Sequence, residues 1–351
     1  MIAPSKSKTD IQHFLKLASS LPVADVRTPS EFMSGHIPGA FNIPLFSDAE
    51  RERVGIIYKK EGRINAIREG LRLAGPGLAE KLEKAIDLAA GGRLLVHCWR
   101  GGMRSEAMAW LFSLGGVDCE ILEGGYKSYR HHVLESLSAH RKIYILGGLT
   151  GSGKTELLHY LKRSGQQVID LEGLANHKGS AFGALGQEAQ PSSEHFANML
   201  FSEWEKTDPS LPVWVEDESR NIGSVFMPDT FYNKLQENPA IILMMDIETR
   251  LPRLMNEYSR YNKSDLRTCV MKISKRLGGD NTREALEAIE SGDLSRTAEI
   301  TLRYYDKAYL YGLKKKKEQN IIYVSSDTDD VALNAARVLE AAEKINRLRQ
   351  L

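Results

Sequence analysis

Two glycine-rich segments, each lying between a short apolar run and a helical pattern, constrain the fold of this chain most strongly. They are HCWRGGMRS, residues 97–105, and GGLTGSGKT, residues 147–155. The apolar run RLLVHC leads into the first, and KIYIL leads into the second. A strand, a glycine-rich turn and a helix, in this order, form the repeating unit of α/β proteins with parallel sheets. The two segments therefore predict an α/β protein with a ligand-binding loop in each half.

The rest of the chain continues this alternation. In the first half the expected strands are LPVADVR, FNIPL, RLLVHC and CEILEGG, and the expected helices are LAEKLEKAIDLAA and RSEAMAWLFSLGG. In the second half the expected strands are KIYILGG, QQVIDLEG, VWVEDES, AIILMMDI and NIIYVSS. A chain of 351 residues has the length of two ordinary domains. We predict domains at residues 1–137 and 138–351, the second built on a doubly wound parallel sheet.

Charge and cysteine content exclude several classes of protein. The net charge is +1, from 47 basic and 46 acidic residues, which excludes a generally basic nucleic-acid binder but not a local basic patch. The three cysteines, at 98, 119 and 269, have neither metal-ligand spacing nor the density of a disulfide framework. No apolar run reaches the roughly 18 residues of a membrane span. These features predict a cytoplasmic protein with reduced thiols, no zinc site and no membrane association.

The first loop predicts a reactive thiol. The strand should end at Cys98, and the two glycines after it let the backbone curl so that its amides point inward. Such amides, a helix N-terminus and nearby arginines stabilise an anion and lower the pKa of a thiol. A buried structural cysteine, which is how we interpret Cys119 and Cys269, needs none of these features. Cys98 is the predicted nucleophile, and the predicted anion-binding loop is Trp99, Arg100, Gly101, Gly102, Met103 and Arg104.

The second loop satisfies the pattern G-x-x-x-x-G-K-[ST] of a P-loop. It follows an apolar strand and opens a helix, which is the context that the pattern requires. Its backbone amides would hold a diphosphate, Lys154 would bridge the terminal phosphate, and Thr155 could hold a magnesium ion. The predicted diphosphate-binding residues are Gly148, Thr150, Gly151, Ser152, Gly153, Lys154 and Thr155.

Acidic residues end two further strands of the second half, in IDLEG and VWVEDES. Ligands of parallel sheets bind at the carboxyl ends of the strands. These acidic residues are Asp170, Glu172, Glu216, Asp217 and Glu218. One of them could coordinate a metal ion or act as a base, with Asp170, Glu216 and Glu218 as the leading candidates. Capping of the following helix is an equally good interpretation of each.

The residues around Cys98 resemble the rhodanese family. A second stretch, ADVRTPSEFMSGHIPGAFNIP, resembles the N-terminal pattern of that family. The resemblance implies that Cys98 carries a chalcogen as a persulfide, and that Asp25 and Arg27 are structural supports near the loop. The spacing from Cys98 to Arg104 is C-x5-R, one residue longer than in common sulfurtransferases and equal to that of dual-specificity phosphatases. A longer loop suits a larger, phosphate-bearing ligand.

The order of a rhodanese segment and then a P-loop closely resembles the tRNA 2-selenouridine synthases, through essentially the whole chain. The segments that carry this resemblance are VGIIYKKEGRINAIREG, EGGYKSYR, DLEGLANHKGSAFG and EDESRNIG. The resemblance implies a transferase that converts wobble-position 2-thiouridine in tRNA to 2-selenouridine. It implies S-alkylation by geranyl diphosphate, followed by replacement of the geranylthio group with selenium from selenophosphate. The P-loop would then bind a diphosphate leaving group, and Cys98 would carry selenium as a selenosulfide.

The same resemblance implies tRNA as the partner, a supplier of selenophosphate as a further candidate partner, and no tightly bound cofactor. A basic stretch at about 250–283 contains tyrosines among its cations, so it offers both phosphate contact and base stacking. A solvated helical face is the alternative interpretation. In P-loop kinases this region often forms a lid over the ligand, which slightly favours a contact role. The candidate tRNA-binding residues are Arg260, Lys263, Arg267, Lys275 and Arg276.

Other functions remain open at this point. An ATP-dependent P-loop kinase or ATPase fused to a rhodanese sulfurtransferase would turn over nucleotide. A phosphatase would explain the C-x5-R spacing but would leave Lys154 without a role. A regulatory protein with an inactive rhodanese module is disfavoured, because Cys98 is present.

Overall fold

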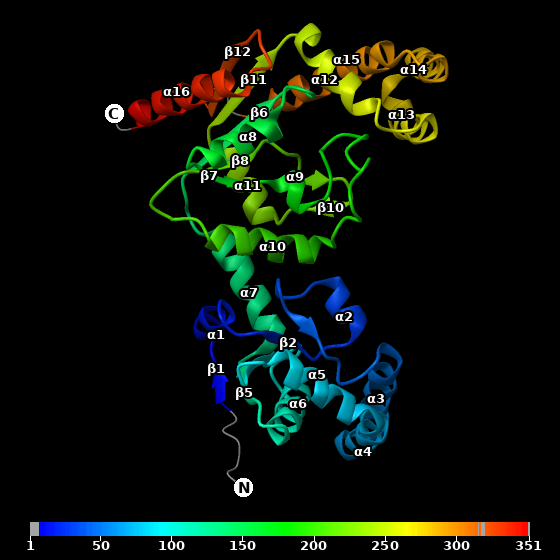
Figure 1. The fold of residues 1–351 in the computed structure, drawn as a ribbon, viewed down its shortest axis with the longest axis vertical. Coiled ribbons are helices and arrows are strands. Elements are labelled where there is room, and N and C mark those ends of the chain that lie inside the picture. The colour runs from blue at the N-terminus through cyan, green and yellow to red at the C-terminus, as the bar shows by residue number, and fades with distance from the viewer. Residues whose placement is uncertain (1–6, 315, 317–319, 350–351) are drawn as a thin grey trace. The chain divides into compact units, whose positions relative to one another are not determined.

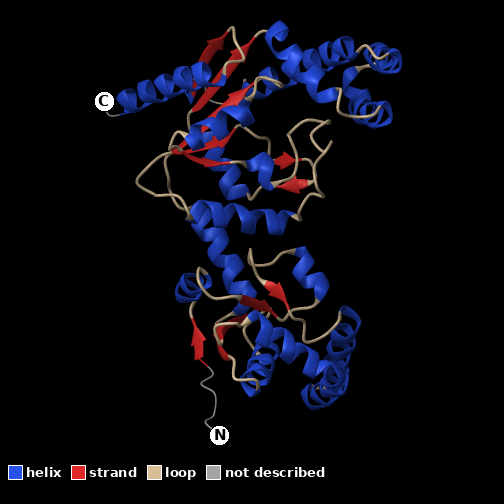
Figure 2. Ribbon diagram, in the orientation of Figure 1, coloured by secondary structure: helices blue, strands red, loops and turns tan. Residues whose placement is uncertain are grey.

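The computed structural model describes residues 7–314, 316 and 320–349 (Figure 1). The chain divides into two compact units, which we call unit 1 (residues 1–136 and 197–201) and unit 2 (residues 137–196 and 202–351). Each unit holds a five-stranded sheet whose strand pairs are all parallel. Figure 2 shows strands accompanied by helices in both units. The predicted α/β class is confirmed.

Unit 1 has the strand order β1-β5-β4-β2-β3. Its strands are β1 (Ser7–Thr9), β2 (Val23–Asp25), β3 (Phe41–Asn42), β4 (Arg93–His97) and β5 (Asp118–Leu122). Its helices are α1 (Ile11–Ala18), α2 (Pro29–Ser34), α3 (Asp48–Glu61), α4 (Arg63–Ala74), α5 (Leu78–Leu88) and α6 (Met103–Leu114); α7 (Gly125–Ser138) follows β5. The central strand β4 is a continuous buried apolar run, as expected for a parallel strand covered on both faces.

The core of unit 1 joins β4 to the helices around it, with Leu94 and Val96 packed among Ala85 and Phe112. All four strands expected in this half are present. The sequence patterns did not predict α3, which has no buried residue and therefore no apolar face. A capping box at Ser47 and Glu50 begins this helix instead.

Unit 2 has the strand order β12-β11-β6-β8-β7, and all five strands expected in this half are confirmed. These strands are β6 (Ile143–Gly148), β7 (Gln167–Ile169), β8 (Val213–Glu216), β11 (Ala240–Met245) and β12 (Ile321–Ser326). The helices α8 (Lys154–Arg163), α9 (Leu171–Leu174), α11 (Asp229–Glu237) and α16 (Val331–Arg349) belong to this unit; α10 (Ser193–Glu205) has residues in both units. A short antiparallel pair, β9 (Asn221–Ile222) and β10 (Val225–Phe226), completes the strands.

Between β11 and β12 the chain forms four helices that are grouped together in Figure 1. They are α12 (Ile247–Tyr258), α13 (Lys263–Leu277), α14 (Gly279–Ser291) and α15 (Leu294–Leu313). They share a core of their own, which includes Leu266, Ile289 and Leu302. The predicted contact segment at 250–283 lies inside this helical group, which extends further along the chain than the segment does. Among the described residues, no helix is both long enough and apolar enough to cross a membrane.

Candidate active sites

The thiol of Cys98 lies at the base of a loop whose donors converge on it. The residue is only 3% exposed. The backbone N–H groups of Arg100, Gly102 and Ser105 hydrogen-bond its sulfur, and the Ser105 hydroxyl oxygen lies 3.3 Å from that sulfur. Burial alone would raise the pKa of Cys98, but these donors outweigh it, so its pKa lies below the ordinary value. The loop therefore favours the nucleophilic thiolate.

The other two cysteines behave in the opposite way. Burial, with a smaller contribution from Asp118, raises the pKa of Cys119 to about 12. Burial also raises the pKa of Cys269. Neither environment favours a thiolate near neutral pH, in contrast to that of Cys98.

The turn between β5 and α7 packs against the backbone of the Cys98 loop. Gly101 has a φ of 63°, and a Cβ at that position would overlap the carbonyl oxygen of Leu122. Gly125 has a φ of 61°, and a Cβ there would overlap the Cys98 carbonyl oxygen. The N–H of Tyr126 donates to that same carbonyl at 2.8 Å. The glycines of EGGYKSYR thus allow two backbone segments to touch, a role that sequence analysis did not assign to them.

The two arginines of the loop differ in their surroundings. Arg104 is paired with Glu31, with Nη1 2.6 Å from Oε2, and both side chains are partly buried. Arg100 is exposed and makes no ion pair with any residue that the structure describes. Of the two predicted anion-binding arginines, Arg100 is therefore open to a ligand, whereas Arg104 is held by a carboxylate. Trp99 and Met103 are also exposed on the rim of this loop.

Behind the loop, Asp25 and Arg27 form a buried ion pair with Nη2 2.6 Å from Oδ2. Both residues are 0% exposed. The guanidinium also lies 3.7 Å from the ring centroid of Tyr126. These contacts agree with the supporting role that the rhodanese resemblance implied.

The P-loop joins β6 to α8 in unit 2. Gly151 and Gly153 adopt φ values of 79° and 77°, which only glycine adopts without strain. Gly153 is the N-cap of α8 and supplies no side chain to cap the helix. The first amides of α8 are therefore available to an anion, as in other phosphate sites at helix N-termini. The ammonium of Lys154 donates to the Gly148 carbonyl at 2.9 Å, across the base of the loop.

Two side chains from the helical group support the P-loop from behind. The Tyr309 hydroxyl accepts a hydrogen bond from the Gly148 N–H at 3.0 Å and donates to Asp217 at 2.9 Å. The Arg250 guanidinium donates to the Thr150 carbonyl at 2.9 Å and forms a two-bond pair with Asp306. Arg250 is 2% exposed. The basic stretch therefore includes one arginine that supports the P-loop and cannot reach RNA.

The acidic residues beside the P-loop have distinct surroundings. Glu216 is fully buried and accepts hydrogen bonds from the Leu171 and Glu172 N–H groups at 2.7 and 3.1 Å. Asp170 caps α9 through the Gly173 N–H at 2.6 Å and also contacts His159. The capping interpretation therefore describes Asp170. Burial, and then neighbouring carboxylates, raise the pKa of Glu216 well above its ordinary value.

Glu172 and Glu218 lie nearest to the P-loop side chains. Glu172 accepts a hydrogen bond from the Thr155 hydroxyl at 3.0 Å. Burial, and then the Glu172 carboxylate, raise the pKa of Glu218 well above its ordinary value. Within residues 7–314, 316 and 320–349, no three His, Cys, Asp or Glu side chains are arranged to hold a metal ion. Glu172, an acidic residue of the same segment as Asp170, is thus the one that contacts the P-loop threonine.

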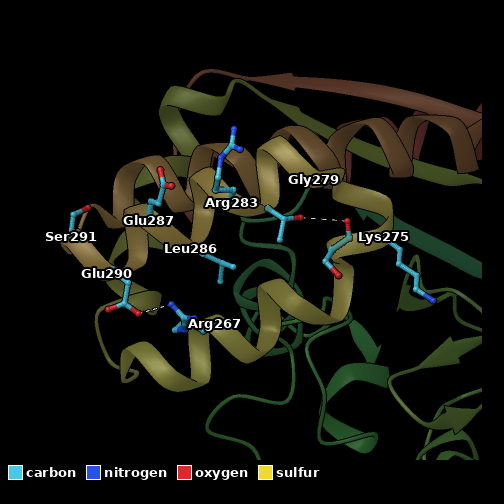
Figure 3. A pocket seen from close by; sticks show the side chains of 10 residues that line it. Arg267, Lys275, Gly279, Arg283, Leu286, Glu287, Glu290 and Ser291 are labelled. Atoms are coloured by element: carbon cyan, nitrogen blue, oxygen red, sulfur yellow. Dashed lines mark hydrogen bonds and ion pairs between the residues drawn. The ribbon is translucent and has the colours of Figure 1, made fainter.

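The candidate tRNA-binding residues lie on or near α13. A hollow of about 790 Å³ is lined by residues of α13 and α14, among them Arg267 and Lys275 (Figure 3). Arg267 is paired with Glu290 at 2.6 Å, and Lys263 donates to the Glu290 carbonyl. Arg260, Lys275 and Arg276 are exposed and form no ion pair in the described part of the chain. These three unpaired cations are the stronger candidates for contact with phosphates.

Comparison with known proteins identifies the family. Residues 141–340 match the family described as the tRNA 2-selenouridine synthase AAA domain, and residues 10–132 match the rhodanese-like domain. A tRNA 2-selenouridine synthase of Nitrosomonas europaea is 32% identical over 349 residues, covering 84% of this chain and 90% of that protein. The chain belongs to the tRNA 2-selenouridine synthase family. It is therefore a tRNA-modifying transferase.

Further members show the same relationship. A tRNA 2-selenouridine synthase of Shewanella frigidimarina is 35% identical over 341 residues, covering 87% of this chain and 92% of that protein. One from Marinobacter nauticus is 33% identical over 353 residues, covering 90% of this chain and 95% of that protein. The similarity extends through both domains, as the resemblance of the linking segments predicted.

Proposed function

We propose that this synthase converts 2-thiouridine at the wobble position of tRNA to 2-selenouridine in two steps. In the first step the sulfur of the nucleoside attacks the first carbon of geranyl diphosphate and diphosphate departs. In the second step selenium from selenophosphate replaces the geranylthio group. The observation that carries the proposal is the presence, in one chain, of an open P-loop and a loop that lowers the pKa of a thiol.

In the first step the P-loop would bind the diphosphate. Its amides and Lys154 would stabilise the negative charge that develops on the leaving oxygen as the carbon–oxygen bond breaks. The Thr155 hydroxyl and the Glu172 carboxylate, 3.0 Å apart, are oxygen donors of the kind that Mg²⁺ takes beside phosphates. If Mg²⁺ accompanies the diphosphate, these two groups would hold it, and the ion would neutralise phosphate charge.

In the second step the Cys98 loop would receive selenophosphate. Arg100 and the inward-pointing amides would bind the anion, and the Cys98 thiolate would displace the geranylthiolate from the C2 carbon of the nucleoside. The selenium of selenophosphate would then displace the Cys98 sulfur from that carbon, and water would cleave the remaining bond between selenium and phosphorus to release phosphate. The tRNA would present its anticodon region, and the reaction would take place in the cytoplasm with selenophosphate delivered by a supplying enzyme.

The test is mass analysis of nucleosides from 2-thiouridine-containing tRNA after incubation with the purified protein. Geranyl diphosphate alone should yield S-geranyl-2-thiouridine, and addition of selenophosphate should yield 2-selenouridine. Unchanged 2-thiouridine in both reactions would refute the proposal.

An ATP-dependent reaction is the second candidate. A cavity of about 640 Å³ borders Leu149 of the P-loop at the ends of β11 and β12, and polar side chains such as Arg337 and Asp327 line part of it. A cavity of this size and polarity can hold a nucleoside. Release of ADP by the purified protein in the presence of tRNA would favour this candidate, and its absence would favour geranyl diphosphate.

A further inference from the structure

Arg253 reaches the P-loop from outside the motif. It lies on α12, and its guanidinium packs directly against Gly153, the last glycine before Lys154. A Cβ built on Gly153 would lie 3.0 Å from the Arg253 Cζ and 3.1 Å from each terminal nitrogen. The P-loop therefore has a second cation beside it, contributed by a residue a hundred positions further along the sequence.

The place where Arg253 meets the loop is the place where an anion would bind. Gly153 caps α8 without a side chain, so the positive end of that helix faces this position. The Lys154 ammonium is next to it in sequence. Lys154, Arg253 and the N-terminus of α8 are all positive, so nearby negative charge is needed to offset their repulsion. In the described structure Glu156 supplies this charge, with Oε2 2.5 Å from the Arg253 Nη1.

The pair with Glu156 is one that a ligand can replace. The Glu156 side chain is 62% exposed and the Arg253 side chain is 23% exposed. An ion pair with one exposed partner contributes little to stability, because water screens it. A diphosphate carries more negative charge than one carboxylate and accepts several charge-assisted hydrogen bonds from a guanidinium.

A comparison within α12 shows that this exchange is particular to Arg253. Arg250, one turn earlier, is buried and is held by both oxygens of Asp306. Its guanidinium contacts the Thr150 carbonyl and cannot turn toward a ligand without breaking both bonds to the half-buried Asp306 carboxylate. Arg250 therefore supports the loop, whereas Arg253 has a weak partner and a position at the mouth of the loop.

We propose that Arg253 is a diphosphate-binding residue, which exchanges Glu156 for the diphosphate of the substrate. This inference rests on the proposed function of the P-loop. With Lys154, Arg253 neutralises the charge that diphosphate gains when the bond from its oxygen to the geranyl carbon breaks and the electron pair stays on that oxygen. The RNA sulfur forms the new bond to that carbon.

The experiment is calorimetric titration of the full-length protein with inorganic pyrophosphate. Arg253→Ala should weaken pyrophosphate binding about ten- to a hundredfold, the equivalent of losing charge-assisted hydrogen bonds. Arg253→Lys should recover part of this loss, because it restores the charge without the planar fork. Arg163→Ala, which removes an exposed arginine from the far end of α8, is the matched control and should bind pyrophosphate like the parent.

Three outcomes separate this inference from the proposed function. If Lys154→Ala loses pyrophosphate binding but Arg253→Ala retains it, the P-loop remains a diphosphate site and Arg253 is not part of it. If the parent protein binds no pyrophosphate, both proposals fail. Glu156→Gln should bind pyrophosphate several-fold more tightly, because the competing carboxylate is gone; weaker binding would show that Glu156 holds Arg253 in place and would overturn the exchange. Thermal unfolding of every variant identifies any that fails to fold.

Discussion

The Cys98 loop and the P-loop have the same local structure but differ in the origin of the anion that their backbone amides face. Both follow a buried parallel strand, turn on glycines in the left-handed region and lead into a helix. In the Cys98 loop the amides point at an anion that the protein itself supplies, and that thiol is 3% exposed. In the P-loop no side chain caps α8, so the first amides of that helix are available to an anion from solution.

This difference also governs the cations of the two loops. In unit 1 the Glu31 carboxylate holds Arg104, and the donors around Cys98 stabilise the thiolate without that arginine. In unit 2 the Lys154 ammonium hydrogen-bonds a neutral carbonyl at 2.9 Å and forms no ion pair with a described residue, although the Glu172 and Glu218 carboxylates lie near enough to interact with its charge; Arg253 has an exposed partner. The same strand, loop and helix can therefore serve two kinds of site. The loop suits a nucleophile where the protein itself supplies the anion, and it suits a ligand where the anion must come from outside.

The largest expected effect separates the two loops by reaction step. Cys98→Ser should abolish selenium incorporation and leave geranylation largely intact, because displacement by the RNA sulfur needs no protein thiol. Nucleoside mass analysis measures both products in one reaction. Cys119→Ala is the control and should retain both steps, since the raised pKa of Cys119 keeps it un-ionised. Full selenation by Cys98→Ser would remove the thiol from the mechanism.

The second prediction tests the role of the Lys154 ammonium in the P-loop. Lys154→Ala should cost about 2 to 4 kcal/mol of transition-state stabilisation in geranylation, because it removes the cation nearest the leaving group. Single-turnover geranylation gives the rate, and calorimetry gives the affinity for geranyl diphosphate. Lys162→Ala, on the exposed face of the same helix, should leave both unchanged. Equal rates for Lys154→Ala and the parent would mean that the P-loop serves another ligand.

The third prediction extends the comparison to the unpaired cations of the helical group in unit 2. Removing Arg260, Lys275 and Arg276 together should flatten the dependence of log tRNA affinity on log salt by about two to three units, a little under one for each phosphate contact. Arg267→Ala should change the slope less than Arg276→Ala does, because Glu290 already neutralises Arg267. tRNA titrations at several salt concentrations provide the slopes. If the triple variant and the parent have the same slope, RNA binds elsewhere.

The smallest expected effect sharpens the account of the thiol. The Ser105 hydroxyl is one of the donors that lower the pKa of Cys98. Ser105→Ala removes it and stabilises the thiolate less, so the pKa must rise and the thiolate fraction at neutral pH must fall. The rate of alkylation of Cys98 by iodoacetamide, followed by peptide mass analysis across a pH series, should then have its midpoint at higher pH. An unchanged midpoint would assign the lowered pKa to the backbone donors alone.

Much of the fold was predictable because its signals are local. Strands buried on both faces are continuous apolar runs, so strands such as β4 and β11 could be read from single segments, RLLVHC and AIILMMDI. Cys98 and Lys154 were identifiable because the glycines that shape each loop are its immediate neighbours in sequence. α3 was not predicted, because a helix that buries no residue has no periodic apolar face.

The sequence by itself therefore determined the α/β class, the order of the two loops and the residues at the centre of each. Only the tertiary structure decided which charges are free to act. Arg104 meets a carboxylate 73 positions away, and the Gly148 amide meets a hydroxyl 161 positions away. Arg250 and Arg253 look alike in sequence, yet one is buried with Asp306 and the other lies against Gly153. A local sequence pattern reflects only residues that are neighbours in sequence. The partner of a charged side chain depends on how elements far apart in the sequence pack together.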